Sequence, residues 1–184
     1  MTTELDSKII WSLIVVSLGA VGLLGWRSLA FGILKRFIKR KFPHVQTLTT
    51  QELAQWLNSQ QPQPVLLDAR NAIEYQQSHL QQAQHIDPQQ PDLSALPQSP
   101  ETPIVVYCSV GYRSAKIAAK LAEAGYKHVY NLEGSIFQWV NEGRPVYQDN
   151  NPTTQVHPYD RRWGQLLKPK YRAKLETDEE RSGL

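Results

Sequence analysis

The sequence predicts an α/β domain with a mostly parallel central sheet, preceded by one N-terminal transmembrane helix. An uncharged apolar run near the start indicates the membrane helix, and short apolar strands that alternate with amphipathic helices indicate the sheet. At 184 residues the chain is long enough for one ordinary domain with appendages. We divide it into an N-terminal tail with the membrane helix over residues 1–26, a basic amphipathic segment over 27–43, an α/β domain over 44–147 and a C-terminal tail over 148–184.

The apolar run IIWSLIVVSLGAVGLLGW occupies residues 9–26 and contains no charged residue. Its length is close to the roughly 20 apolar residues that a helix needs to cross about 30 Å of hydrocarbon, so we predict a single membrane span. A cleaved secretory signal is one alternative, but Glu4, Asp6 and Lys8 precede the run where a basic leader is expected, and no convincing cleavage site follows. A buried core helix is the other alternative, and such helices seldom lack charge over so many residues.

Six basic residues follow this run between Arg27 and Lys41. By the positive-inside rule they place the globular part on the cytoplasmic side of the membrane, or its topological equivalent. The apolar residues between them share one helical face: Leu29, Ile33, Leu34, Phe37, Ile38 and Phe42. We expect a short helix that ends before Pro43 and lies on anionic membrane lipid, with a solvated charged helix as the alternative.

Composition excludes several functions. Cys108 is the only cysteine, so the chain cannot form an intrachain disulfide or a multi-cysteine metal site of its own. The five histidines are dispersed and do not indicate a metal site. The net charge of +3 is modest for this length, so it does not indicate that the protein binds nucleic acid.

Helix and strand signals alternate after the basic segment. Thr49, with Glu52 three residues later, is typical of a capping box at the start of an amphipathic helix. The further elements expected in this half are a buried strand over 65–67, a short helix over 73–80, a short strand within 83–87 and a loop over 88–103 with at most one helical turn.

The second half of the domain contains the clearest strand, PIVVYC, which is β-branched and apolar. After it we expect a helix that begins at Ser114 and stops at Gly125, a strand over 129–132 and a helix over 135–143. The tail is rich in proline and ends in an acidic cluster. It is interpreted as an extended arm that packs its aromatic residues on the domain, as a partner-binding arm or as a solvated tail.

Cys108 lies where a strand ends and a helix begins, which is the usual place for chemistry in a parallel α/β sheet. Gly111 allows the following SVGYR loop to turn its backbone N–H groups inward. Together with the positive end of the next helix and the Arg113 guanidinium, these groups favour a thiolate and attract an anion. We therefore expect one loop to activate the nucleophile and to bind its substrate.

The same residues resemble a known family. YCSVGYRSA is similar to the active-site loop of rhodanese-type sulfurtransferases, and LLDARNAIEYQQSHLQQAQHI upstream and GYKHVYNLEGSIFQWVNEGRPV downstream resemble further motifs of that family. The resemblance covers Val45 to Tyr147. The chain departs from the family pattern at Ser78, where glycine is common, and at Gln82-Ala83, where a Gly-Ala pair is common.

The resemblance implies a three-layer rhodanese-like domain and a double-displacement reaction through a persulfide on Cys108. A small anionic donor such as thiosulfate would supply the sulfur, and a thiol or cyanide acceptor, small or carried by a protein, would remove it without a metal or organic cofactor. Asp68, Arg70 and Glu74 would be structural. The residues expected to bind the substrate are Ser109, Val110, Gly111, Tyr112, Arg113 and Ser114.

Three other interpretations stay open on the residues alone. Cysteine-arginine phosphatases and arsenate reductases place five residues between the two side chains, whereas four separate Cys108 from Arg113, and the smaller loop favours sulfur. A non-enzymatic, membrane-tethered binding or sulfur-relay module, with the tail as its docking arm, is the second interpretation. A buried structural thiol is the third.

Overall fold

The computed structural model describes residues 25–175, in two units that divide between Ile33 and Leu34. Residues 25–33 of the first unit are helical, and the second unit begins with helical residues 34–41, so the helix ends before Pro43 as predicted. No helix within residues 25–175 combines the length and apolar character that a membrane span requires. The predicted span over 9–26 lies, apart from its last two residues, outside the described part, and it stays a prediction.

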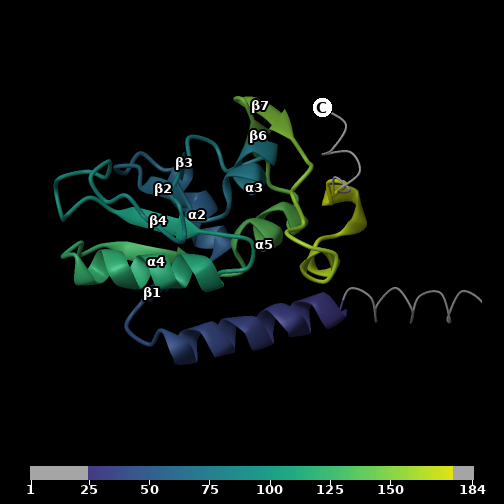
Figure 1. Cartoon of the computed structure of the whole chain (residues 1–184), viewed down its shortest axis with the longest axis horizontal. Helices are drawn as coiled ribbons and strands as arrows, with labels where there is room; N and C mark the ends of the chain where they lie inside the picture. The colour runs from purple at the N-terminus through teal and green to yellow at the C-terminus, as the bar shows by residue number, and fades with distance from the viewer. Residues whose placement is uncertain (1–24, 176–184) are drawn as a thin grey trace, which may run out of the picture. The chain divides into compact units, whose positions relative to one another are not determined.

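Five parallel strands form the centre of the second unit (Figure 1), which confirms the predicted sheet. Their order across the sheet is β1-β5-β4-β2-β3. All four residues of the central strand β4 are buried, as expected for a strand covered on both faces. The strands are β1 (Gln46–Leu48), β2 (Val65–Asp68), β3 (Gln84–His85), β4 (Ile104–Tyr107) and β5 (Val129–Leu132).

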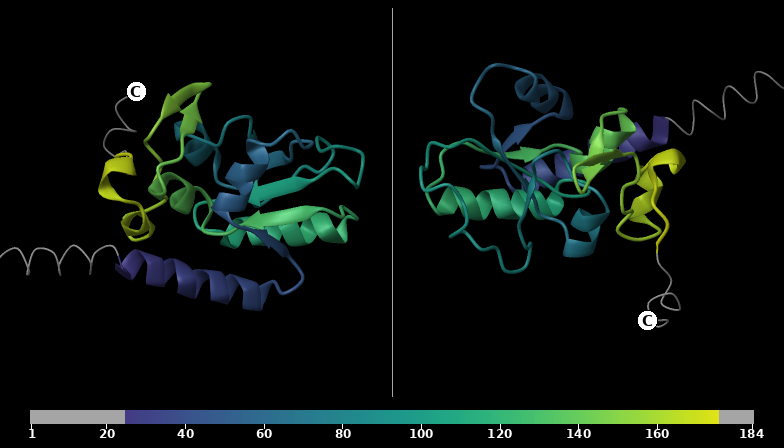
Figure 2. Two further views of the ribbon diagram at one scale, coloured as in Figure 1. Left: turned by 180° about the vertical axis from the view of Figure 1, so that it is seen from behind. Right: turned by 90° about the horizontal axis from the view of Figure 1, so that it is seen from above.

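Helices cover the sheet on both faces. Figure 2 shows α4 on one side of the strands and α2 on the other, and α2 contacts α5. Ile117 and Leu121 of α4 belong to one buried cluster with Leu67 and Val106 of the sheet, which holds α4 in place. The helices are α2 (Thr50–Leu57), α3 (Ala72–Gln77), α4 (Tyr112–Glu123) and α5 (Ser135–Asn141).

Two helix boundaries differ from the prediction. α3 ends at Gln77 because Ser78 is extended and the backbone of His79 exchanges two hydrogen bonds of 2.8 Å with Tyr147. α4 begins two residues before Ser114, because Gly111 adopts a φ of 111° and turns the chain directly into the helix. That backbone conformation is readily available only to glycine.

The C-terminal tail packs on the domain as far as residue 175. β6 (Val146–Gln148) and β7 (Asn151–Thr153) form an antiparallel hairpin, so the expected boundary at residue 147 falls inside β6. Two 3-10 helices follow, η1 (Trp163–Leu166) and η2 (Pro169–Tyr171). Five apolar residues of the tail are buried, namely Val156, Leu166, Leu167, Tyr171 and Ala173. The described part of the tail therefore packs on the domain, but Tyr159 and Trp163, the two aromatic residues expected to pack, are 45% and 38% exposed. The partner-binding interpretation stays a prediction.

Candidate active site

Cys108 follows β4 directly, and its position is fixed by the start of α5. The Cys108 N–H donates to Ser135 Oγ at 3.1 Å, and the Ile136 N–H donates to the Cys108 carbonyl at 3.1 Å. The residue is 1% exposed. The thiol is therefore held at the carboxyl edge of the sheet, as the sequence predicts.

Two donors of the loop face the sulfur. The Gly111 N–H lies 3.1 Å from Cys108 Sγ, and Ser114 Oγ lies 3.5 Å from it. Ser114 Oγ is also 2.7 Å from Asn131 Oδ1, so its single proton serves one of two acceptors. Asn131 in turn donates from Nδ2 to the Gly111 carbonyl at 3.1 Å, which ties the loop to β5. The sequence analysis did not assign Asn131 to the site. The available signal was an amide side chain within an otherwise apolar strand.

The surroundings of Cys108 favour its ionised form. Burial raises the pKa of the thiol, but the positive charge of Arg113 and the hydrogen bonds from Ser114 and Gly111 outweigh it, so the pKa lies below the usual value for cysteine. A lowered pKa increases the thiolate fraction at neutral pH, and the thiolate is the nucleophile.

Arg113 is paired with a carboxylate in this structure. Its Nη1 lies 2.7 Å from Glu74 Oε2, and its Nη2 lies 2.9 Å from Glu74 Oε1 and 2.9 Å from Ser109 Oγ. Burial raises the pKa of Glu74, but the bonds and charge of Arg113 outweigh it and lower the pKa. The guanidinium was expected to face a donor anion, whereas the structure shows it bridged to Glu74, with the Tyr159 ring 5.0 Å from Arg113 Cζ.

Asp68 and Arg70 lie near the site, as expected, because Asp68 pairs with Tyr107, the residue before Cys108, but neither side chain lines the pocket over the thiol. Arg70 Nη2 is 2.6 Å from Asp68 Oδ2, and both side chains are fully buried. The same guanidinium donates to the Ser78 carbonyl, so the pair joins the end of β2 to the segment after α3. Burial lowers the pKa of Arg70, but the Asp68 carboxylate outweighs it and raises that pKa.

A pocket of about 350 Å³ lies over Cys108. Its walls come from the active-site loop, from the helix that precedes the domain and from the tail. The lining residues outside the loop are Leu34, Phe37, Ile38, Tyr159 and Trp163. Sequence analysis did not assign these five to the site, because nothing local in either segment shows that the two meet over the loop.

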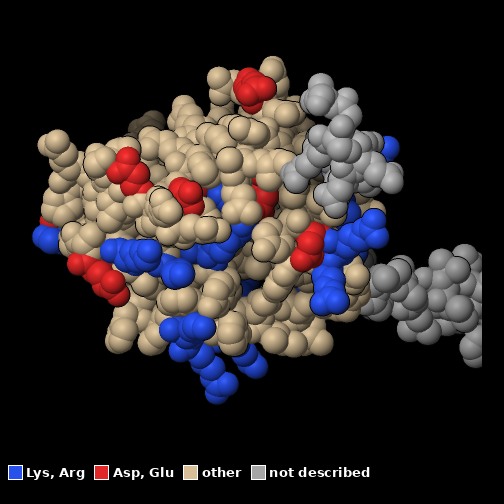
Figure 3. All heavy atoms as spheres, in the orientation of Figure 1, with Lys and Arg blue, Asp and Glu red and all other residues tan. Residues whose placement is uncertain are grey.

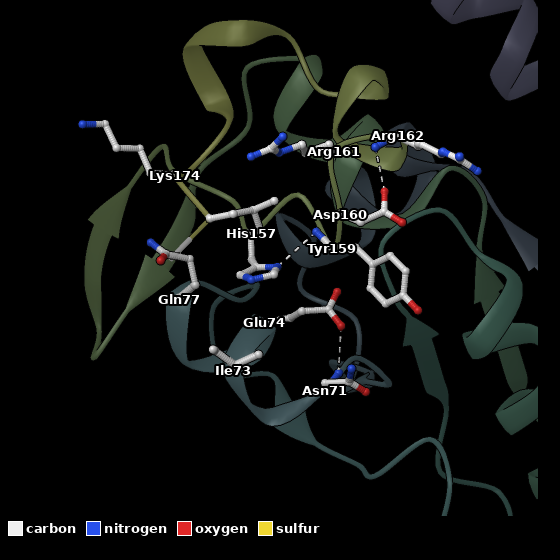
Figure 4. A pocket seen from close by; sticks show the side chains of 11 residues that line it. Asn71, Ile73, Glu74, Gln77, His157, Tyr159, Asp160, Arg161, Arg162 and Lys174 are labelled. Atoms are coloured by element: carbon white, nitrogen blue, oxygen red, sulfur yellow. Dashed lines mark hydrogen bonds between the residues drawn. The ribbon is translucent and has the colours of Figure 1, made fainter. Parts of the chain in front are cut away.

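A second pocket of about 650 Å³ adjoins the first at Tyr159, which lines both (Figure 4). In the close-up Glu74 lies between Asn71 and His157. Among residues 25–175, no group of three or more His, Cys, Asp or Glu side chains is placed to hold a metal ion. On the face drawn in Figure 3, Lys and Arg side chains are interleaved with Asp and Glu and do not form one continuous basic surface.

The class of this protein is an α/β domain with a candidate nucleophilic thiol. The parallel sheet, its two helical layers and the cysteine loop at the end of β4 define this class. The family model described as "Rhodanese-like domain" matches residues 49–142, about half of the chain. The chain therefore belongs to the rhodanese-like domain family, which confirms the family resemblance seen in the sequence.

Curated relatives of this chain carry more than one named activity. It is 35% identical to a thiosulfate sulfurtransferase GlpE of Actinobacillus succinogenes over 50% of this chain and 82% of that protein. It is 31% identical to a tRNA uridine(34) hydroxylase of Sodalis glossinidius over 59% of this chain and 32% of that protein. The chain thus spans about a third of the second relative.

Solved structures show the same fold. A rhodanese-like domain protein of Staphylococcus aureus matches 57% of this chain and 99% of its own, with a TM-score of 0.51 and 24% identity. A thiosulfate sulfurtransferase of Pseudomonas aeruginosa matches 64% of this chain and 23% of its own, with a TM-score of 0.54 and 22% identity. At these identities the likeness concerns the fold alone.

Proposed function

We propose that this protein is a membrane-anchored sulfurtransferase that carries sulfane sulfur as a persulfide on Cys108. The observation that carries the proposal is the environment of Cys108 Sγ, which faces the Gly111 N–H and Ser114 Oγ and whose pKa is lowered with the help of Arg113. The four-residue gap to Arg113 leaves a small loop that suits a sulfur atom better than a phosphoryl group. Sulfur transfer is also the named activity of the GlpE relative.

The reaction has two displacement steps. In the first, the Cys108 thiolate attacks the outer sulfur of thiosulfate, the S–S bond of the donor breaks, and sulfite leaves with the bonding electron pair. In the second, a thiolate or cyanide attacks the terminal sulfur of the persulfide, the new S–S bond breaks, and the Cys108 thiolate is restored.

The loop has a role in both steps. The Gly111 N–H and Ser114 hydroxyl face Sγ, and we expect them to stabilise the negative charge of the persulfide as well. Preorganised donors of this kind stabilise developing charge without reorganisation. Arg113 favours the ionised form of the thiol through its charge, while Glu74 and Ser109 fix the orientation of the guanidinium.

The membrane anchor is part of the same proposal. It is supported by the uncharged run over residues 9–26 and by the basic residues that follow it. We propose a single-pass protein whose catalytic domain faces the cytoplasm or its topological equivalent. Protease protection in sealed membrane vesicles checks this, because a tail that resists protease added on the cytoplasmic face contradicts the orientation.

The sulfur-transfer test uses the full-length protein in detergent. Incubation with thiosulfate should add one sulfur to the intact mass, and cyanide should then remove it. Cys108→Ser is the matched control and should gain no mass, because a hydroxyl cannot form a persulfide. If no donor adds sulfur while a phosphate ester is hydrolysed in a Cys108-dependent manner, the phosphatase alternative replaces this proposal.

A further inference from the structure

The pocket over Cys108 has mostly apolar walls. Its volume of about 350 Å³ falls in the usual range for small organic ligands. Phe37, Tyr112 and Trp163 supply aromatic rings to it, and Leu34 and Ile38 supply aliphatic side chains. Of the described residues that line this pocket, only Arg113 carries a charge besides the Cys108 thiolate.

Most of these walls lie outside the part of the chain that matches the family. Residues 34–38 and 159–163 lie outside the 49–142 match to the family, so the family resemblance does not account for them. They are also built into the site. The Phe37 ring stacks on Tyr112 with centroids 6.2 Å apart, and a Cβ atom added at Gly111 would lie 3.4 Å from Ile38 Cδ1. The helix before the domain is therefore packed directly on the active-site loop.

The positive charge in the pocket is already compensated. Arg113 makes a bidentate ion pair with Glu74, which itself is almost fully buried. Lys35 is near enough to pair with Glu133, at 3.4 Å, and Lys41 lies 5.3 Å from the centroid of the Tyr112 ring, but neither lysine lines the pocket. A charged group on the acceptor, in addition to the attacking thiolate, would lose water to the apolar walls or compete with Glu74 for the guanidinium, and both cost free energy. Thiosulfate meets the same cost when it loads Cys108, so the apolar walls are better explained by the acceptor than by this donor.

Resting on the sulfur transfer proposed above, we propose that the acceptor is an organic thiol with an uncharged, apolar carbon skeleton. Its carbon group would pack against Phe37, Tyr112 and Trp163, with its sulfur toward Cys108. After the thiol has lost its proton to water, the thiolate attacks the terminal sulfur of the Cys108 persulfide. One S–S bond forms and one breaks, the acceptor leaves as a persulfide, and the Cys108 thiolate is restored.

The test compares three thiols of similar acidity on the full-length persulfide in detergent. They are benzyl mercaptan, which is apolar, 2-mercaptoethanol, which is polar and uncharged, and 2-mercaptoethanesulfonate, which is an anion. We expect benzyl mercaptan to remove the sulfur about tenfold faster than the anion, as for other apolar groups in a matched pocket. Equal rates, or a faster anion, overturn the proposal.

Variants separate the pocket from any effect of the detergent. Phe37→Ala and Trp163→Ala each remove one aromatic ring from the wall of the pocket. Phe37 is 52% exposed and Trp163 is 38% exposed, so the fold should persist in both variants. Each should lower the preference for benzyl mercaptan severalfold. Ile73→Ala, 38% exposed and outside this pocket, is the matched control and should leave the preference unchanged.

The outcomes also separate the two proposals. A persulfide that forms but shows no apolar preference, or a preference that neither wall variant changes, overturns the acceptor assignment and leaves sulfur transfer standing. Failure of every donor to load Cys108 overturns both.

Discussion

Two buried arginine–carboxylate pairs in one domain have different surroundings. Asp68 and Arg70 are two residues apart, and both side chains are fully buried. Glu74 and Arg113 are 39 residues apart, and the arginine side chain keeps 23% of its surface exposed while the glutamate keeps 1%. The first pair bonds to the Ser78 carbonyl after α3, whereas the second adjoins the thiol.

The difference between the two pairs indicates that the degree of burial decides whether a charged pair acts mainly on folding or also on the active site. A fully enclosed pair has its charges neutralised by each other and acts mainly on folding, since loss of either partner leaves an uncompensated buried ion. The Glu74–Arg113 pair sits at the wall of a pocket, so its guanidinium still acts on Cys108 and lowers the pKa of that thiol. Four variants test this contrast.

The largest effect is expected for Asp68→Asn. It leaves the Arg70 guanidinium charged and buried without its carboxylate, so the free energy of unfolding should fall by about 3–5 kcal/mol. Chemical denaturation measures it. The double variant Asp68→Leu/Arg70→Met removes both charges and should recover much of the loss. If the double variant is as unstable as the single one, the pair stabilises the fold through its packing and hydrogen bonds and not through the neutralisation of buried charge.

Arg113→Gln should act chiefly on the thiol. Removal of the positive charge raises the pKa of Cys108 and so lowers the thiolate fraction at neutral pH. The pH dependence of alkylation by iodoacetamide measures this pKa. Arg113→Lys keeps the charge, so the pKa of Cys108 in this variant should lie between its values in the wild type and in Arg113→Gln. An unchanged alkylation profile in Arg113→Gln would mean that the loop donors alone ionise the thiol.

Glu74→Gln should change how stability depends on acid. The pKa of Glu74 in the folded protein lies below its ordinary value of 4.5, so the ionised carboxylate stabilises the fold above that pH. This stabilisation is lost as the pH falls through the lowered pKa. Thermal unfolding between about pH 3 and pH 6 should therefore show a shallower slope in Glu74→Gln than in the wild type. Parallel slopes would contradict the assignment of this linkage to Glu74.

The smallest effect is expected for a third pair, between Lys127 and Glu101, which is exposed on both sides. Lys127→Ala should leave the denaturation midpoint unchanged within error, because solvent screens such pairs and ordering them costs side-chain entropy. A shift in the midpoint as large as that of Asp68→Asn would show that the exposure of an ion pair does not determine how much it contributes to stability.

Local patterns predicted much of this fold. The capping box at Thr49 forms as expected, with the Glu52 N–H 3.2 Å from Thr49 Oγ1, because both partners lie within one helical turn. The strand that ends at Cys108 was predicted from its own β-branched residues. In contrast, β1 was missed because three residues at the edge of a sheet carry too little hydrophobic pattern to stand out.

The sequence by itself determined the family, the parallel sheet and the position of the thiol between a strand and a helix, because these depend on short-range periodicity and on one contiguous loop. Only the tertiary structure decided that Arg113 is paired with Glu74, that Asn131 supports the loop and that Phe37 and Trp163 wall the pocket. Those partners are far apart along the chain. Their contacts follow from how helices and tail pack on the sheet, which no local pattern of residues specifies.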